Sequence, residues 1–128
     1  MNRYLLDTHI AIWFLTGDTV LPLKIKKIIS DRTNRIYLSV LSAWELTIKI
    51  SIGKLRFPGD AAGFINAAKS NDITILPIDG EHLTVLKDLP HIHHDPFDRL
   101  LIATAISEDM KIITVDKNIM RYDVPIIW

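Results

Sequence analysis

The feature that most constrains the fold is a set of short, continuous apolar runs, each separated from the next by a segment with helical periodicity. The runs cover residues 4–6, 36–39, 73–76, 111–115 and 124–127, and the last of them carries Pro125. Strands buried on both faces have this uninterrupted apolar pattern, because helices cover both sides of a parallel sheet. The pattern predicts a three-layer α/β/α fold with a central, mainly parallel sheet of four to five strands. The run that carries proline is expected at the edge of the sheet.

The segments between the apolar runs carry helix signals. Ser39 or Ser42 is expected to cap a helix that runs through Glu45 to about residue 52, where Gly53 ends it. Strands and helices therefore alternate along the chain, as in doubly wound α/β proteins. Further helices are expected at residues 10–15, from Pro22 with Ile25, Ile28 and Ile29 facing inward, at residues 61–70 with Asp60 as the cap, from Asp79, and from Pro96.

Length and composition limit the class of protein. The chain has 128 residues, equal numbers of basic and acidic side chains, and no cysteine. This length predicts one domain over residues 1–128, and zero net charge means that any contact with nucleic acid must be local and salt-sensitive. The apolar runs are too short for a signal peptide or a membrane span. The lack of cysteine leaves a reducing compartment open, and we predict a cytoplasmic protein that does not bind membranes.

Four acidic residues lie near the ends of the predicted strands. Asp7 ends the first run and Asp116 ends the fourth. Asp98 falls in the first turn of the helix that leads into the fourth run, and Glu45 falls on the second helical turn after the second run. Because ligands bind beyond the carboxyl ends of parallel strands, we expect these four acids to meet at one edge of the sheet.

Four carboxylates at one edge would repel one another and raise one another's pKa unless a cation were present. A set of oxygen ligands suits a hard divalent cation, so we predict Mg²⁺, for which Mn²⁺ can substitute. Such a site supports attack of a metal-activated water on a phosphodiester. The sequence therefore predicts a metal-dependent hydrolase whose catalytic residues and metal ligands are Asp7, Glu45, Asp98 and Asp116.

The stretch His94-Asp95-Pro96-Phe97-Asp98 holds two aspartates with different expected roles. Asp95 suits the N-cap, because its side-chain oxygen can accept a hydrogen bond from a free amide in the first turn. Pro96 suits the first helical position, where its missing N–H costs nothing. In one interpretation, both aspartates only cap the helix and stabilise its positive end. In the other, Asp98 lies close to acids from other segments and binds the metal ion with them.

Four motifs, in order along almost the whole chain, resemble those of the PIN domain. They are Asp7-Thr8 after an apolar strand, Ser39 followed by Glu45, Asp98 ahead of Leu-Leu-Ile-Ala-Thr-Ala, and Thr114-Val115-Asp116. The chain is most similar to the VapC type, the single-domain PIN nuclease that is the toxin of bacterial type II toxin–antitoxin pairs. The resemblance implies a Mg²⁺-dependent endoribonuclease, commonly a homodimer, that a small antitoxin holds inactive. It also implies that Asp7, Glu45 and Asp98 are the core acids and Asp116 the more variable fourth.

Polar residues close to these acids are candidates for binding RNA. Basic side chains after Glu45 could contact phosphates, and a solvated helix end that complements the helix dipole explains them equally well. The candidates for substrate binding are Thr8, Lys49, Lys54, Arg56 and Arg99.

Histidines and aromatic residues offer further candidates. His91, His93 and His94 could bind Zn²⁺, but no further ligand lies at the usual spacing, so a loop ahead of the helix is the preferred interpretation. Trp13 and Trp44 are expected in the core or at an interface, where they are the best anchors for an antitoxin.

Two other classes of function compete with a nuclease. A phosphoacceptor receiver domain should have paired acids after its first strand, where this chain has only Asp7. A non-catalytic PIN-like binding module would be expected to have lost acids, whereas this chain keeps all four.

Overall fold

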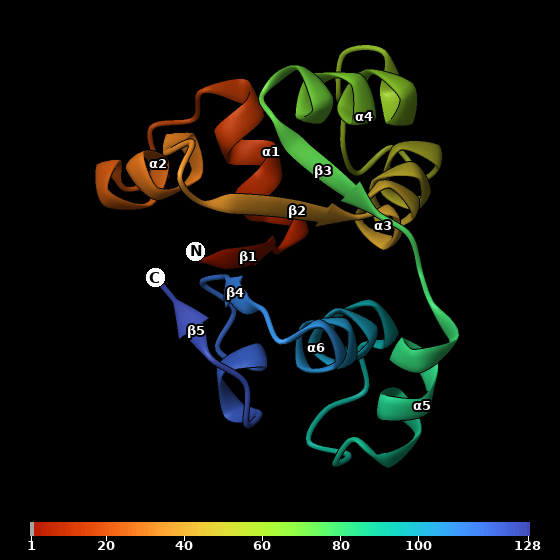
Figure 1. Ribbon diagram of the computed structural model, residues 1–128. Helices are drawn as coiled ribbons and strands as arrows, with labels where there is room; N and C mark the ends of the chain where they lie inside the picture. Colours follow the sequence, from red (N-terminus) through yellow and green to blue (C-terminus); the bar gives the residue numbers. More distant parts are fainter. Residues whose placement is uncertain (1) are drawn as a thin grey trace.

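The computed structural model describes residues 2–128 and has a five-stranded parallel sheet at its centre (Figure 1). The strands lie in the order β3-β2-β1-β4-β5, and each neighbouring pair is parallel. The prediction of a central parallel sheet is confirmed. The strands are β1 (Arg3–Leu6), β2 (Arg35–Ser39), β3 (Ile73–Leu76), β4 (Lys111–Ile113) and β5 (Ile126–Ile127).

The helices form two layers, one on each face of the sheet, as Figure 1 shows. No helix within residues 2–128 combines the length and the apolar character needed to cross a membrane. One layer contains α1 (Thr8–Thr16), α2 (Leu23–Ser30), α3 (Val40–Ser51) and α4 (Asp60–Ser70). The other contains α5 (Gly80–Asp88), α6 (Pro96–Glu108) and the short 3-10 helix η1 (Ile119–Arg121).

The apolar run in β1 supplies both layers of the core. Successive residues of a strand point to opposite faces, so an uninterrupted run packs on both. Leu6 belongs to the cluster that contains Ile10 of α1 and Phe64 of α4, whereas Leu5 belongs to the cluster that contains Ile102 of α6. All five side chains are fully buried. The continuous apolar runs are thus explained by helices on both sides of the sheet, which confirms the three-layer α/β/α prediction.

The order of the strands creates a switch point between β1 and β4. The chain builds β1, β2 and β3 outward in one direction and then returns to place β4 and β5 on the other side of β1. Ligands of open α/β sheets bind beyond the carboxyl ends of the strands at such a point. A receiver domain has the order 2-1-3-4-5. The observed order therefore excludes the receiver alternative.

Most of the predicted helix caps are present. The side chains of Ser39, Asp79 and Asp95 each accept a hydrogen bond from the backbone amide two residues later. The predicted cap at Asp60 is wrong, because Asp60 already lies inside α4 and its side chain makes no capping bond. Gly59 occupies the cap position with φ +74°, a left-handed conformation that glycine adopts without a steric cost.

The fourth and fifth strands are shorter than their apolar runs. β4 ends at Ile113, and the hydroxyl of the next residue, Thr114, donates to Asp7 and accepts a bond from the Asp116 amide. β5 begins after Pro125 and forms the edge of the sheet, which confirms the predicted edge position. Of the apolar residues outside the strands, Val124 is buried in the core, whereas Val115 is exposed.

Candidate active site

A small hollow opens where the carboxyl ends of the strands meet the first turns of α3 and α6. Asp7, which directly follows β1, lines it together with Glu45 of α3 and Asp98 of α6. The other lining residues are Thr8, Leu41, Ser42, Phe97 and Leu101. Three of the four acids expected at this edge therefore face one hollow. Asp116 is the exception, since it does not line the hollow.

Asp7 is fixed in place by the neighbouring strand. Its backbone amide donates to the Ile113 carbonyl at 3.0 Å, and the Thr114 hydroxyl donates to its Oδ2 at 2.7 Å. Asp7 occupies the N-cap position of α1, yet its side chain makes no capping bond. The side chain is buried, which is the main reason that its pKa is raised. The carboxylate of Glu45 raises this pKa further, while the Thr114 bond and nearby His9 lower it.

Asp98 lies one turn into α6 and is held by a histidine from the preceding loop. Its Oδ2 lies 3.1 Å from Nε2 of His93. Burial is the main cause that raises the pKa of Asp98 to about 6, and the carboxylates of Asp95, Asp116 and Asp7 add to it. The bond to His93 acts in the opposite direction. The negative charges of Asp7 and Asp116 therefore raise the pKa of Asp98, even though these residues come from other segments.

The remaining two acids are also engaged with their own neighbours. Glu45 Oε2 lies 3.3 Å from Nζ of Lys49, one helical turn away. Asp116 Oδ1 accepts a bond from the amide of Asn118 at 2.7 Å and so supports the turn before η1. The Asp116 amide donates to the Thr114 hydroxyl at 3.0 Å. Thr114 therefore connects the segment after β1 with the segment after β4.

The expected meeting of four carboxylates is only partly found. Asp7, Glu45 and Asp98 share the hollow, and Asp116 influences Asp98 from beside it. Within residues 2–128, no group of three or more histidine, cysteine, aspartate or glutamate side chains is arranged so that it could hold a metal ion. The four-carboxylate metal site therefore stays a prediction. Each acid is bonded to a neighbouring group, Asp7 to Thr114 of the segment after β4 and the other three to groups close by in the sequence.

Two candidates for substrate binding lie in the interior. The Thr8 hydroxyl is buried and donates to Oγ of Ser42 at 2.8 Å, which ties the start of α1 to α3. Arg99 is also buried, and its guanidinium donates to the carbonyls of Pro90 and Leu89 and to the Tyr122 hydroxyl. The expected role of Arg99 in binding substrate needs correction, because its guanidinium is buried and bonds groups of the protein itself. Thr8 lines the acidic hollow, and its role in binding substrate stays a prediction.

The other basic candidates lie at the surface. Lys54 and Arg56 are exposed on the segment that follows α3, and Lys49 pairs with Glu45 beside the hollow. Positive charge therefore lies at the surface on the same side of α3 as one of the acids.

The three histidines of the loop before α6 differ in exposure. His91 and His94 are exposed, whereas His93 turns inward to Asp98.

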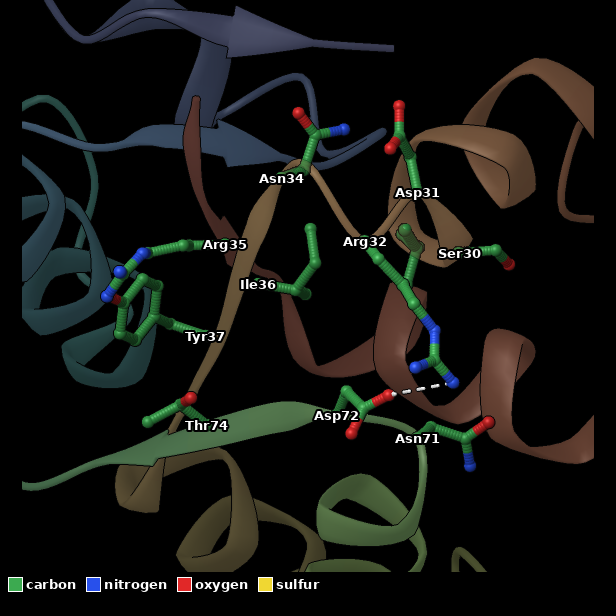
Figure 2. A pocket seen from close by; sticks show the side chains of 11 residues that line it. Ser30, Asp31, Arg32, Asn34, Arg35, Ile36, Tyr37, Asn71, Asp72 and Thr74 are labelled. Atoms are coloured by element: carbon green, nitrogen blue, oxygen red, sulfur yellow. Dashed lines mark ion pairs between the residues drawn. The ribbon is translucent and has the colours of Figure 1, made fainter. Parts of the chain in front are cut away.

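A larger hollow lies at the opposite edge of the sheet, at the amino ends of β2 and β3 (Figure 2). Its volume is about 370 Å³, and an ion pair of 3.6 Å joins two of its lining residues, Arg32 and Asp72. None of the four acids lines it. Because ligands of parallel sheets bind at the carboxyl ends, we place the candidate active site at the smaller, acidic hollow.

Comparison with known proteins identifies the family of this chain. The chain matches the family described as PIN domain over residues 4–125. This chain belongs to the PIN domain family. PIN domains are generally nucleases, and PIN nucleases typically use divalent metals. Comparison with curated protein sequences finds no match.

Solved structures share the PIN fold over nearly the whole chain. VapBC2 from Rickettsia felis, bound to a DNA fragment from its promoter, has a TM-score of 0.76 at 16% identity, covering 98% of this chain and 97% of that chain. DNA-bound VapBC from Salmonella typhimurium gives 0.73 at 18%, covering 99% and 98%. VapBC-5 from Mycobacterium tuberculosis gives 0.62 at 20%, covering 99% and 98%. These similarities show that the chain has the same fold as these proteins.

Several residues that shape this PIN domain site carry little signal in the sequence. Ser42 stands out only as a possible helix cap, yet it accepts the bond from buried Thr8. Tyr122 lies between two turns, and its hydroxyl contacts both His93 and Arg99. Thr114 could have been found, because a hydroxyl residue two positions before an acid at a strand end is placed to bond both that acid's amide and the neighbouring strand.

Proposed function

We propose that this PIN domain, taken as one unit over residues 1–128, is a Mg²⁺-dependent endoribonuclease of the VapC type, the toxin of a type II toxin–antitoxin pair. The observation that carries the proposal is the acidic hollow at the switch point. There, burial and neighbouring carboxylates raise the pKa of both Asp7 and Asp98. Proteins do not maintain such repulsion for stability, since it destabilises the folded state, and a site for a cation accounts for it.

We assign Asp7, Glu45, Asp98 and Asp116 as the catalytic acids. The chemistry of this all-oxygen donor set fits Mg²⁺ or Mn²⁺. Mg²⁺ needs only one or two protein carboxylates, so Asp7 and Asp98, with Glu45 nearby, are proposed to supply its protein ligands. A bound divalent cation would lower the pKa of a water and offset charge on the phosphate oxygens.

The protein's own groups support this role by holding the acids still. The Thr114 hydroxyl donates to one oxygen of the Asp7 carboxylate, and the Asp7 side chain is buried. Lys49, Lys54 and Arg56 are proposed to contact RNA phosphates, because they are the basic side chains that follow Glu45 around the end of α3. With zero net charge overall, this contact should weaken steeply as salt is added.

We also propose a homodimer and a cognate antitoxin as partners of this protein in the cytoplasm. The exposed apolar stripe on α3 supports a protein interface, because exposed apolar patches mark such surfaces. Its members recur every fourth residue and lie at least one-third exposed: Val40, Trp44, Ile48 and Ile52. The solved neighbours are VapBC complexes, which supports an antitoxin partner for this chain.

Incubation of the purified protein with a panel of RNAs tests the nuclease proposal. Cleavage is expected with Mg²⁺ or Mn²⁺ and not with EDTA, and Asp7→Asn and Asp98→Asn should each lower the rate by orders of magnitude. Asp95→Asn is the matched control, because Asp95 caps α6 and asparagine caps about as well. RNA binding without cleavage in every metal would instead favour a non-catalytic binding module.

A further inference from the structure

His93 is the one histidine of its loop that contacts an acid of the proposed site. The loop of residues 89–95 joins α5 to α6, and buried Arg99 holds it by donating to the carbonyls of Leu89 and Pro90. The His93 side chain is only 12% exposed to solvent. Its ring lies between the Tyr122 hydroxyl, 2.8 Å from Nδ1, and Asp98 Oδ2, 3.1 Å from Nε2.

The hydrogen bonds around Tyr122 determine where the proton of His93 lies. The Tyr122 oxygen accepts from Nη1 of Arg99 at 3.0 Å and from the backbone amide of His93 at 3.3 Å. Arg99 has no acceptor atom, so neither of these bonds can run the other way. The Tyr122 hydroxyl hydrogen then has Nδ1 of His93 as its partner. Nδ1 is therefore an acceptor, and in a neutral ring the proton is on Nε2.

We infer that His93 is a positioning residue for Asp98: as the neutral Nε2–H tautomer it donates to Oδ2 and fixes the orientation of the carboxylate. Every bond in the chain from Arg99 through Tyr122 and His93 is donated toward Asp98. The bond occupies Oδ2, and no donor among residues 2–128 bonds Oδ1, which stays available at the hollow. The inference rests on the proposed function, in which Asp98 is one of the catalytic acids.

A carboxylate held in this way needs no reorientation before it acts. In the first turn of α6 the Asp98 side chain could otherwise turn to its free backbone amides, as aspartate does at helix starts. Asp95 already bonds the Phe97 and Asp98 amides, and His93 holds Asp98 from the other side. Partners of this kind, which orient a ligating group without touching the reacting atoms, typically change metal affinity or activity by about 10–100-fold.

Nitrogen-15 NMR of the histidine rings tests the tautomer directly. At a pH where its ring is neutral, one histidine of the metal-free protein in EDTA, assigned by its absence from His93→Gln, is expected to carry its proton on Nε2. A neutral ring protonated on Nδ1 would overturn the inference. This measurement needs no activity, so it stands even if the protein cuts no RNA.

Kinetics of three variants test the positioning role. His93→Leu removes the donor and should lower kcat by about 10–100-fold with KM for RNA unchanged. His93→Gln keeps an N–H donor and should recover most of that loss, whereas a merely structural role predicts no such recovery. His94→Leu is the matched control, because His94 lies in the same loop, is exposed and makes no bond among the described residues.

The outcomes separate the two proposals. Equal kcat for His93→Leu and His94→Leu, with wild-type cleavage intact, would refute the role of His93 alone. A wild-type protein that cuts no RNA in Mg²⁺ or Mn²⁺ would refute the proposed function. Mg²⁺ titration by calorimetry gives a readout independent of turnover, and His93→Leu is expected to bind Mg²⁺ more weakly than His94→Leu. Should His93→Leu not fold, the comparison of His93→Gln with wild type and the ring spectrum decide.

Discussion

Asp98→Asn is expected to stabilise the metal-free protein while removing its proposed activity. The carboxyl pKa is raised from 3.8 to about 6, chiefly by burial, so the folded state binds the proton more tightly than the unfolded state. The ionised carboxyl therefore destabilises the folded protein above pH 6, and this penalty fades as the pH falls from 6 toward 3.8. Asparagine keeps an oxygen that can accept from His93 and never carries the charge.

The size of the effect follows from the same pKa. One unit of pKa difference corresponds to about 1.4 kcal/mol, which sets an upper limit of about 3 kcal/mol. The Asp98 side chain keeps 16% of its exposure, and solvent screens its neighbours' charges, so about 1–2 kcal/mol is expected. For a domain of this size that is a rise in Tm of roughly 4–8 °C at pH 8.

Thermal and urea unfolding in EDTA between pH 4 and 8 measure this difference. The advantage of Asp98→Asn over wild type should be largest above pH 6 and should vanish near pH 4. Asp95→Asn keeps the cap and removes one of the charges that raise the pKa of Asp98, so it is expected to shift the stability in the same direction by less than Asp98→Asn does. An Asp98→Asn variant that is less stable than wild type at pH 8, or whose advantage does not change with pH, would refute the electrostatic account of the hollow.

Further perturbations address the other parts of the site. Burial raises the pKa of Asp7, so Asp7→Asn should also stabilise the metal-free protein, and Mg²⁺ should raise the Tm of wild type by more than that of Asp7→Asn; equal shifts would exclude Asp7 as a ligand. Arg99→Leu leaves two carbonyls and a hydroxyl without their donor and should cost at least about 2 kcal/mol in urea unfolding, whereas a substrate-binding Arg99 would leave stability unchanged. Asp95→Ala should cost about 1 kcal/mol, measured in the same way, with cleavage retained. Ile52→Glu, on the exposed stripe of α3, should shift a dimer toward monomer in sedimentation, and an unchanged sedimentation coefficient would remove that surface from the interface.

The fold could be predicted from the sequence because its signal is local. The run Tyr4-Leu5-Leu6 is apolar at every position, and only a strand covered on both faces uses such a pattern. The edge of the sheet at which Asp7 and Asp98 meet follows from the same reasoning, since all carboxyl ends of a parallel sheet lie together. The apolar runs and the parallel sheet therefore predict the edge at which Asp7, Glu45 and Asp98 lie, although Asp116 lies beside their hollow.

The partners of each side chain could not be predicted, because they depend on loops. An arginine in a helix is usually exposed, so the sequence does not mark Arg99 as buried. Its burial depends on the carbonyls of residues 89 and 90, which only the folded loop brings near. Thr8 is equally ordinary in sequence, and its bond to Ser42 joins helices that begin 32 residues apart, at residues 8 and 40.

The two clearest departures from local rules occur at the same place. Asp7 occupies a helix N-cap but makes no capping bond, which forgoes about 1 kcal/mol of helix stability. β4 ends two residues before its apolar run does, and the hydroxyl of the next residue, Thr114, donates to Asp7. Both departures lie beside a buried carboxylate, whose pKa burial raises, at the carboxyl ends of β1 and β4. Sequences that fold consistently at every other level tend to break these rules where function requires it, so the lost cap and the Thr114 bond together support the proposal that Asp7 is part of the active site.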